Sequence, residues 1–197
     1  MKTRILIYGD SNTWGHRGIP GRYRTTQQWP HILAALLGDE YEIIQEGLGG
    51  RTAGDLESSE VHRNGRTGFE IAMRTANPID YTIIALGTND TKRHYGQTAA
   101  QVIANLDWYD QRIRDFVEES PHASGYEGTF YLGLADIKLE SFDEDIARAI
   151  NQGLSETKPF FIPITGIEHG ADGLHYSETD HQKVARTVYE ALKKENI

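Results

Sequence analysis

The sequence RILIYGDSNTWG, residues 4–15, decides the fold because it joins a buried strand to a polar turn. Residues 5–8 form a continuous apolar run with β-branched and aromatic side chains, which is typical of a strand buried on both faces. The run stops at Gly9, and the small polar residues 10–12 predict a tight turn. Ser11 therefore lies just past the carboxyl end of the strand, the edge where open α/β sheets bind ligands. The alternative is that residues 10–12 only cap the turn that follows.

Four further apolar runs predict strands, and segments with helical spacing lie between them. Strands that alternate with helices predict a parallel sheet covered by helices on both faces. We therefore expect the α/β class, with a flavodoxin-like three-layer α/β/α fold, a five-stranded parallel sheet of order 2-1-3-4-5, and a single domain over residues 1–197. The expected strands are residues 5–8, 41–45, 81–86, 129–134 and 160–164, the expected helices are 28–37, 69–75, 99–119, 143–154 and 178–194, and the expected loops include 14–26 and 166–176.

Composition and charge exclude several classes of protein. The chain has 197 residues, of which 38% are hydrophobic and 25% charged, and this suits a folded soluble domain. Its net charge of −9 disfavours nucleic acid and other polyanionic partners. The absence of cysteine excludes disulfides, a thiol nucleophile and thiolate-bound metals. No apolar run is long enough to span a membrane, and the short run before Gly9 is too brief for a signal-peptide core, so we expect a cytoplasmic protein with no membrane partner.

Polar, glycine-bearing turns follow the first three predicted strands. Ser11 follows the first strand, Gly50 the second and Asn89 the third. Because the carboxyl ends of parallel strands meet at one edge of a sheet, we expect these three residues to converge. Asp172 and His175 lie late in the chain, just before the last predicted helix, and complete the group.

This combination of residue types is what acyl transfer requires. A serine such as Ser11 is a poor nucleophile until a base removes its proton, and His175 is the candidate base. Asp172 can hold the imidazole in one tautomer and stabilise its charged form. We expect it to keep the pKa of His175 at about 6.5 or to raise it. The backbone N–H groups of Ser11 and Gly50 and the side-chain amide of Asn89 are the expected oxyanion donors.

Each of these signals also has a structural explanation. Gly50 suits a plain turn, Asn89 a turn bonded to its own backbone, and His175 the protein surface. A metal site at His169, Asp172 and His175 is a second alternative, but nothing else nearby supports it, so no metal or cofactor is expected. A third alternative is a non-catalytic ligand-binding α/β domain for a phosphate or a flavin. The chain has neither the dinucleotide fingerprint nor the P-loop motif.

The chain resembles the SGNH hydrolases, also called the GDSL esterase and lipase family, in four blocks that occur in the family's order. GDSNT at 9–13 resembles the nucleophile block, the turn that ends at Gly50 the oxyanion-glycine block, GTND at 87–90 the asparagine block, and DGLH at 172–175 the base block. The segments GDSNTWG, EGLGGRT, LGTNDTK and DGLHYS most resemble the bacterial arylesterase and acyltransferase branch. Asn12 departs from the family's usual leucine, which leaves the catalytic assignment alone but is expected to alter local packing.

The resemblance implies a carboxylic ester hydrolase with the triad and oxyanion roles given above, and a tendency to form a homo-oligomer. The catalytic loops are short and no lid-like insertion is visible, so we expect a small-molecule substrate, a soluble ester with a short acyl group that is hydrolysed or transferred. A carbohydrate acetylesterase of the same family is an alternative. Trp14 and Asp10 are the expected substrate contacts. For residues 14–29 three alternatives stay open: they line the entrance of the active site, form a subunit contact, or are a solvated loop. Residues 135–145 either shape a pocket for the acyl group or only pack against the rest of the domain.

Overall fold

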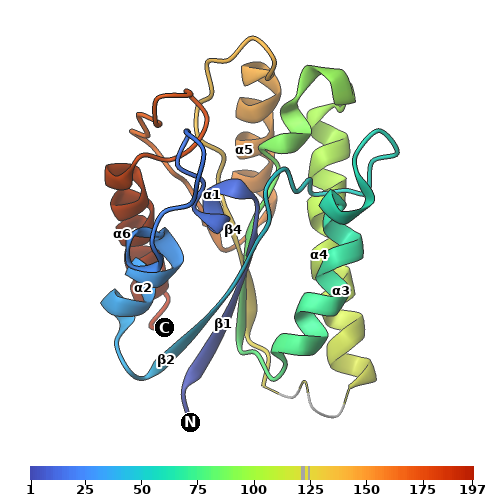
Figure 1. Ribbon diagram of the computed structural model, residues 1–197. Coiled ribbons are helices and arrows are strands. Elements are labelled where there is room, and N and C mark those ends of the chain that lie inside the picture. Colours follow the sequence, from blue (N-terminus) through green and yellow to red (C-terminus); the bar gives the residue numbers. More distant parts are fainter. Residues whose placement is uncertain (121–122, 124) are drawn as a thin grey trace.

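The computed structural model describes residues 1–120, 123 and 125–197 and contains a five-stranded parallel sheet of order β2-β1-β3-β4-β5. This confirms the predicted fold class and strand order. Helices lie on both sides of the sheet (Figure 1). The strands are β1 (Thr3–Gly9), β2 (Tyr41–Gly47), β3 (Tyr81–Ala85), β4 (Gly128–Leu132) and β5 (Phe161–Ile162).

Strand β1 lies inside the sheet, between β2 and β3, and is parallel to both. Its residues 5–8 are wholly buried. Because successive side chains of a strand point to opposite faces, Leu6 and Tyr8 enter one hydrophobic core while Ile5 and Ile7 enter the other. The uninterrupted apolar run in the sequence therefore reflects a strand that has no solvent-facing side.

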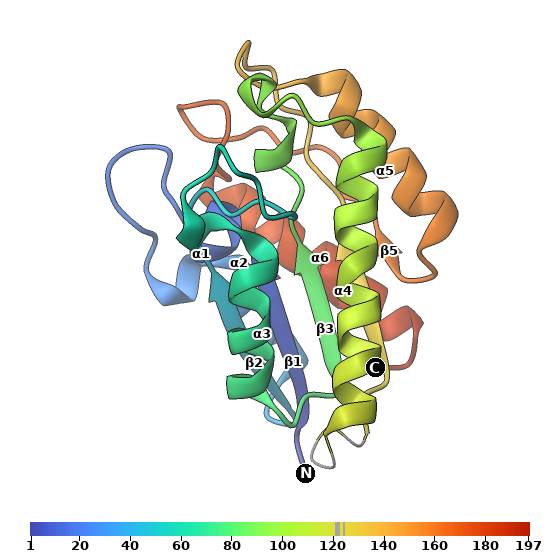
Figure 2. The same ribbon diagram turned by 90° about the vertical axis from the view of Figure 1, so that its right-hand side faces the viewer.

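The helices divide between the two faces of the sheet (Figures 1 and 2). Apolar side chains of α2 and α6 pack with Ile5 and Ile7, whereas those of α3, α4 and α5 pack with Leu6 and Tyr8. The α-helices are α1 (Ser11–Trp14), α2 (Trp29–Leu37), α3 (Gly65–Ala76), α4 (Ala99–Glu119), α5 (Glu144–Thr157) and α6 (Glu178–Lys194). The 3-10 helices are η1 (Thr25–Gln27), η2 (Val61–Arg63), η3 (Asn89–Thr91) and η4 (Arg93–Tyr95).

Helix α3 begins four residues earlier than the predicted Phe69. Its first turn contains glycine and a β-branched residue and has weak intrinsic helix propensity. Asp55 compensates, because Oδ1 of its side chain accepts from the backbone N–H groups of Arg66 at 3.1 Å and Thr67 at 3.2 Å. A side chain 11 residues away in sequence thus caps this helix.

Further segments differ from the prediction: β4 ends at Leu132 rather than at 134, and α5 continues to Thr157 rather than ending at 154. Strand β5 is only two residues long, because Pro163 has no N–H to extend the ladder past Ile162. Residues 11–14 form the short helix α1, so Trp14 ends a helix rather than starting a loop. The rest of the predicted loop 14–26 contains the start of η1.

The carboxyl ends of the strands meet at one edge of the sheet, drawn uppermost in Figure 1, where α1 and the loops after β2 and β3 gather. The segment that precedes α6 returns to this edge. Among the described residues, none of the helices has the length and apolar character that a membrane crossing requires.

Candidate active site

The turn that carries Ser11 is set by its neighbours. Oδ1 of Asp10 accepts the backbone N–H of Asn12 at 2.9 Å and so caps α1 at its first turn. Gly9 precedes it, and a Cβ there would lie 2.0 Å from Oγ1 of Thr13. The absence of a side chain at Gly9 therefore lets α1 fold directly onto the end of β1. Ser11, at the start of this helix, is 8% exposed.

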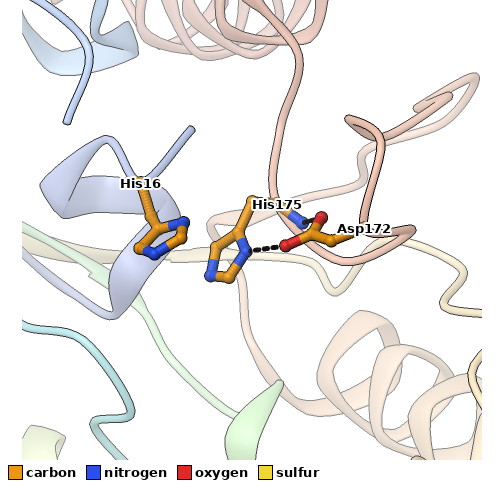
Figure 3. Close-up of side chains that lie close together, drawn as sticks. All are labelled: His16, Asp172 and His175. Carbon is orange, nitrogen blue, oxygen red and sulfur yellow. Dashed lines mark hydrogen bonds and ion pairs between the residues drawn. The ribbon is translucent and has the colours of Figure 1, made fainter. Parts of the chain in front are cut away.

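His175 connects Ser11 to Asp172. Its Nε2 atom lies 3.0 Å from Oγ of Ser11. Its Nδ1 atom lies 2.5 Å from Oδ2 of Asp172, the pair drawn in Figure 3. With Asp172 ionised, the proton of the neutral imidazole sits on Nδ1, and Nε2 is left to accept the Ser11 hydroxyl. The structure thus brings the three residues of the predicted triad into one hydrogen-bonded chain.

The second oxygen of Asp172 shapes the turn that presents His175. Oδ1 accepts the backbone N–H groups of Leu174 at 3.1 Å and His175 at 3.0 Å. Burial raises the pKa of Asp172, but the hydrogen bonds from the His175 ring and these two N–H groups outweigh burial and hold the pKa at about 2. The carboxylate therefore stays ionised over the whole neutral range.

The pKa of His175 lies below its ordinary value of 6.5. Burial is the largest cause, the hydrogen bond to Asp172 raises the pKa in part, and the charge of His16 lowers it again. The expectation that Asp172 would hold or raise this pKa is therefore wrong. Desolvation of the imidazolium outweighs the attraction of a single carboxylate.

His16 covers the His175–Asp172 pair. Its ring stacks on that of His175 with centroids 4.0 Å apart and planes inclined by 27°, and Figure 3 shows His175 between His16 and Asp172. Nδ1 of His16 accepts the backbone N–H of Gly18 at 3.0 Å. A Cβ on Gly18 would lie 2.9 Å from Oδ1 of Asp172. The start of the 14–29 segment therefore packs over the pair.

Asn89 and Gly50 come from neighbouring loops that are bonded to each other. Nδ2 of Asn89 donates to the carbonyl oxygen of Arg51 at 3.0 Å, and Asn89 is 4% exposed. This bond fixes the plane of the amide, and the same Nδ2 atom also donates to Oδ2 of Asp10 at 3.5 Å, a long hydrogen bond. Gly50 immediately precedes Arg51 and has a φ of +76°, a conformation that favours glycine.

Two buried charged residues hold the Gly50 loop in place. Nη1 of Arg51 donates to the carbonyl oxygens of Gly9 at 3.0 Å and Glu46 at 2.5 Å, and so joins the ends of β1 and β2. Asp90 is fully buried and accepts the backbone N–H of Ala53 at 2.8 Å. Burial raises the pKa of Asp90 to about 7. The loop is thus anchored directly after Gly50, to the ends of β1 and β2 and to Asp90.

Asn12 links the nucleophile turn to the base. Its Oδ1 atom accepts the backbone N–H of Tyr176, the residue after His175, at 2.9 Å, and both groups are buried. The polar residue at this position therefore does more than change the packing, because it ties the segment that carries Ser11 to the segment that carries His175. A leucine offers no acceptor for this N–H.

Trp14 and Asp10, the expected substrate contacts, both have partners within the chain. Trp14 is half-buried, with the Arg22 guanidinium 4.8 Å from its ring centre and the Arg22 Nε donating to its carbonyl oxygen at 2.6 Å. Asp10 caps α1, as the structural alternative for that turn anticipated. Contact of either residue with substrate stays a prediction.

The metal site considered from the sequence includes His169, but the histidine that the structure places beside Asp172 and His175 is His16. His169 directs Nε2 to the carbonyl oxygen of Asp136 at 2.7 Å, whereas His16 lies with Asp172 and His175. His175 already directs both ring nitrogens to hydrogen-bond partners, so a metal ion would have to displace Asp172 or Ser11 from the ring. This trio, as arranged, suits hydrogen bonding and does not fit a metal ion.

A family model described as GDSL-like Lipase/Acylhydrolase matches residues 7–183. The match includes both Ser11 and His175 and spans most of the chain. The chain belongs to this family. Membership of the GDSL-like family confirms the resemblance drawn from the four sequence blocks, and it identifies the fold as one that carries ester-hydrolysing enzymes.

Solved structures agree with this assignment of the GDSL-like fold. The aryl esterase of M. smegmatis is 24% identical, with 98% of this chain and 99% of that chain covered and a TM-score of 0.79. A carbohydrate acetylesterase family member from Sinorhizobium meliloti is 23% identical, with 98% of each chain covered and a TM-score of 0.80. At these identities the likeness concerns the fold alone.

A curated relative matches part of the chain. An uncharacterized lipoprotein of Bacillus subtilis, YqeF, is 31% identical over 86 residues, which are 44% of this chain. The match amounts to 31% of that lipoprotein, so the chain spans about a third of the length of this relative.

Several residues of the site were given no role by sequence reasoning. Arg51 and Asp90 lie inside the recognised blocks, but only tertiary contacts reveal that they anchor the Gly50 loop. His16 lies in a segment rich in glycine and arginine and carries no spacing signal, so its stacking on His175 was not predictable.

Proposed function

We propose that the protein is a serine esterase that hydrolyses short acyl groups of small soluble esters through an acyl-enzyme on Ser11. Transfer of the acyl group to an alcohol is the competing fate of that intermediate. The observation that carries the proposal is the chain of hydrogen bonds from Ser11 through His175 to the ionised Asp172. The four sequence blocks and membership of the GDSL-like family support it.

The chemistry follows from this chain of hydrogen bonds. Nε2 of His175 takes the hydroxyl proton as Oγ of Ser11 attacks the ester carbonyl carbon, and Asp172 stabilises the imidazolium that forms. The tetrahedral intermediate collapses, the C–O bond to the alcohol breaks, and His175 returns its proton to the departing alkoxide. Water then attacks the acyl-enzyme with the same base, which releases the acid and restores Ser11.

The negative charge of the tetrahedral intermediate requires hydrogen-bond donors. The proposed donors are the backbone N–H groups of Ser11 and Gly50 and the second N–H of the Asn89 amide. The bond from Asn89 to the Arg51 carbonyl supports this role, because it orients the amide before the substrate arrives. One such donor contributes about 10²–10³ in rate.

The proposed acyl groups run from acetate to butyrate, in keeping with a sequence that has no lid-like insertion. Acetylated carbohydrates are a second proposed class of substrate, because the family that the sequence blocks resemble also includes carbohydrate acetylesterases. Both classes use the same site, and they differ only in the alcohol part of the ester.

A panel of esters tests the function and the substrate class together. Wild-type protein is assayed on nitrophenyl esters of increasing acyl length and on sugar acetates, beside the Ser11→Ala variant and a Ser58→Ala control in an exposed loop. We expect Ser11→Ala to lose nearly all activity, by analogy with a serine protease in which the loss is about 10⁶, and Ser58→Ala to keep it. A folded Ser11→Ala variant with wild-type turnover would overturn the proposal. Preference for long-chain triglyceride emulsions would contradict the short-chain part.

A further inference from the structure

Two cationic side chains border the loops that carry Gly50 and Asn89, in a chain whose net charge is −9. Arg63 belongs to η2, and Lys92 follows η3 directly. Neither is part of the hydrogen-bonded chain that ends at Ser11. Their charges are available to a ligand only where no carboxylate of the chain already pairs with them.

Arg63 lies against the proposed oxyanion glycine. A Cβ on Gly50 would be 2.9 Å from Cδ and 3.0 Å from Nε of Arg63. The Nε atom is 3.0 Å from Oε2 of Glu60, but it is not aligned for a hydrogen bond and is buried without one. The side chain of Glu60 is 60% exposed, and such surface pairs contribute little. The guanidinium is therefore only weakly compensated.

Lys92 is half-buried beside two aromatic rings. Its ammonium lies 6.0 Å from the ring centre of Tyr95 and 5.8 Å from that of Phe142. Within the part of the chain that the structure describes, no carboxylate lies within ion-pair distance of Nζ. Burial lowers the pKa of Lys92, and the charge of Arg63 lowers it further. The charges of Asp10 and Asp90 raise this pKa in part.

The buried carboxyls nearest to Lys92 are already engaged. Asp90 accepts the Ala53 N–H, and Asp10 accepts the Asn12 N–H. Burial raises the pKa of Asp10 to about 6 and that of Asp90 to about 7, so Asp90 is only partly ionised at neutral pH. Asp10 is largely ionised there, but it accepts hydrogen bonds from the Asn12 N–H and the Asn89 amide, not from Lys92. A cation that is half-buried and lacks an ion-pair partner is suited to an anion supplied from outside.

We propose that Arg63 and Lys92 form a subsite for an anionic group of the ester, so that the preferred substrates carry a carboxylate or phosphate close to the scissile bond. This inference rests on the proposed esterase function and adds to it the charge of the substrate. The guanidinium, beside the oxyanion glycine, and the ammonium, one turn after Asn89, bind this group as the carbonyl oxygen enters the oxyanion hole. The subsite is open to an anion on the acyl part or on the alcohol part.

Matched pairs of esters test the subsite. For the acyl side, nitrophenyl hydrogen succinate is compared with its neutral methyl ester, and for the alcohol side, 4-acetoxybenzoate is compared with its methyl ester. The quantity measured is the ratio of kcat/KM for the charged and neutral member of each pair. We expect the wild-type protein to favour the charged member of at least one pair, and added salt to reduce the preference.

Variants assign the preference to the two cations. We expect Arg63→Gln and Lys92→Gln each to lower the charged-to-neutral ratio about tenfold, the low end for a hydrogen bond to a charged group. Arg63→Lys keeps the charge and retains part of the preference. Arg148→Gln is the matched control, because Arg148 pairs with Glu144 on α5, and it leaves the ratio unchanged.

Three outcomes overturn the subsite. The first is a wild-type ratio near one for both pairs, and the second is a ratio that neither Arg63→Gln nor Lys92→Gln lowers. The third is an equal loss of kcat/KM on charged and neutral esters, which would mean that the two cations stabilise the oxyanion or the fold. All three leave the esterase function standing as long as hydrolysis of the neutral esters depends on Ser11. Hydrolysis of every ester by the Ser11→Ala variant would instead refute the proposed function itself.

Discussion

Asp172 uses its two carboxylate oxygens for different tasks. Oδ1 holds the backbone of the turn, while Oδ2 holds the imidazole of His175. The pKa of Asp172 stays at about 2 and that of His175 lies below 6.5, so the pair is a carboxylate and a neutral imidazole near neutral pH. This is the protonation state that the proposed role of His175 as a base requires.

The pH dependence of hydrolysis follows from His175. The imidazole must be unprotonated, so activity rises as the pH increases through the pKa of His175 and then levels off. Because burial and His16 lower this pKa, we expect the midpoint of kcat/KM below pH 6.5. His16→Phe keeps a stacked ring and removes a charge, so its midpoint should move upward. An unchanged profile in His16→Phe, or a wild-type midpoint above 6.5, would count against this account.

The bond from Tyr176 N–H to Asn12 predicts a cost for the family's usual leucine. In Asn12→Leu the buried N–H loses its acceptor, and an unsatisfied buried donor costs about 1–3 kcal/mol. We expect a lower free energy of unfolding by denaturant and a lower kcat, since the turn next to His175 is no longer tied to Ser11. A variant as stable and as active as the wild type would show that this bond is dispensable.

At the scale of elements, the sequence predicted the bounds of a helix well where the residues that cap it lie next to it in the sequence. Helix α4 has the predicted bounds because Thr98 and Gln101 form a capping box at its start. Helix α3 was predicted too short, because its cap is Asp55, which lies outside the helical pattern. Strand β5 was predicted too long, because the apolar pattern continues past Pro163 while the ladder of hydrogen bonds does not.

The loop after β2 depends on Asp90, and this gives stability a pH dependence. The folded-state pKa of Asp90 is raised from 3.8 to about 7, so the folded protein binds the proton more tightly than the unfolded chain. Its contribution to stability is therefore lost as the pH rises through about 7. Asp90→Asn cannot ionise, so we expect its Tm to fall less than that of the wild type between about pH 4 and pH 7, the interval between the unfolded and folded pKa values. Parallel Tm curves would contradict the buried, protonated state.

At the scale of the whole molecule, four segments far apart in sequence form one site because the parallel sheet collects the carboxyl ends of its strands. Ser11 and His175, 164 residues apart, meet at 3.0 Å. The order of the blocks was enough to predict this meeting. The stacking of His16 and the contact of Arg63 with Gly50 depend on how long loops fold back, which no periodic pattern encodes. The homo-oligomer and the cytoplasmic location stay predictions.

Covalent labelling of Ser11 tests the central claim most directly. A phosphonate ester probe reacts with a serine only when a base activates it, so the labelled protein is digested and the modified peptide identified by mass spectrometry. We predict one adduct, on Ser11, that forms together with loss of esterase activity and is absent from His175→Ala, while the Ser58→Ala control is labelled like the wild type. An esterase that is inactivated by an adduct on another residue, or that stays fully active with Ser11 modified, would contradict the account.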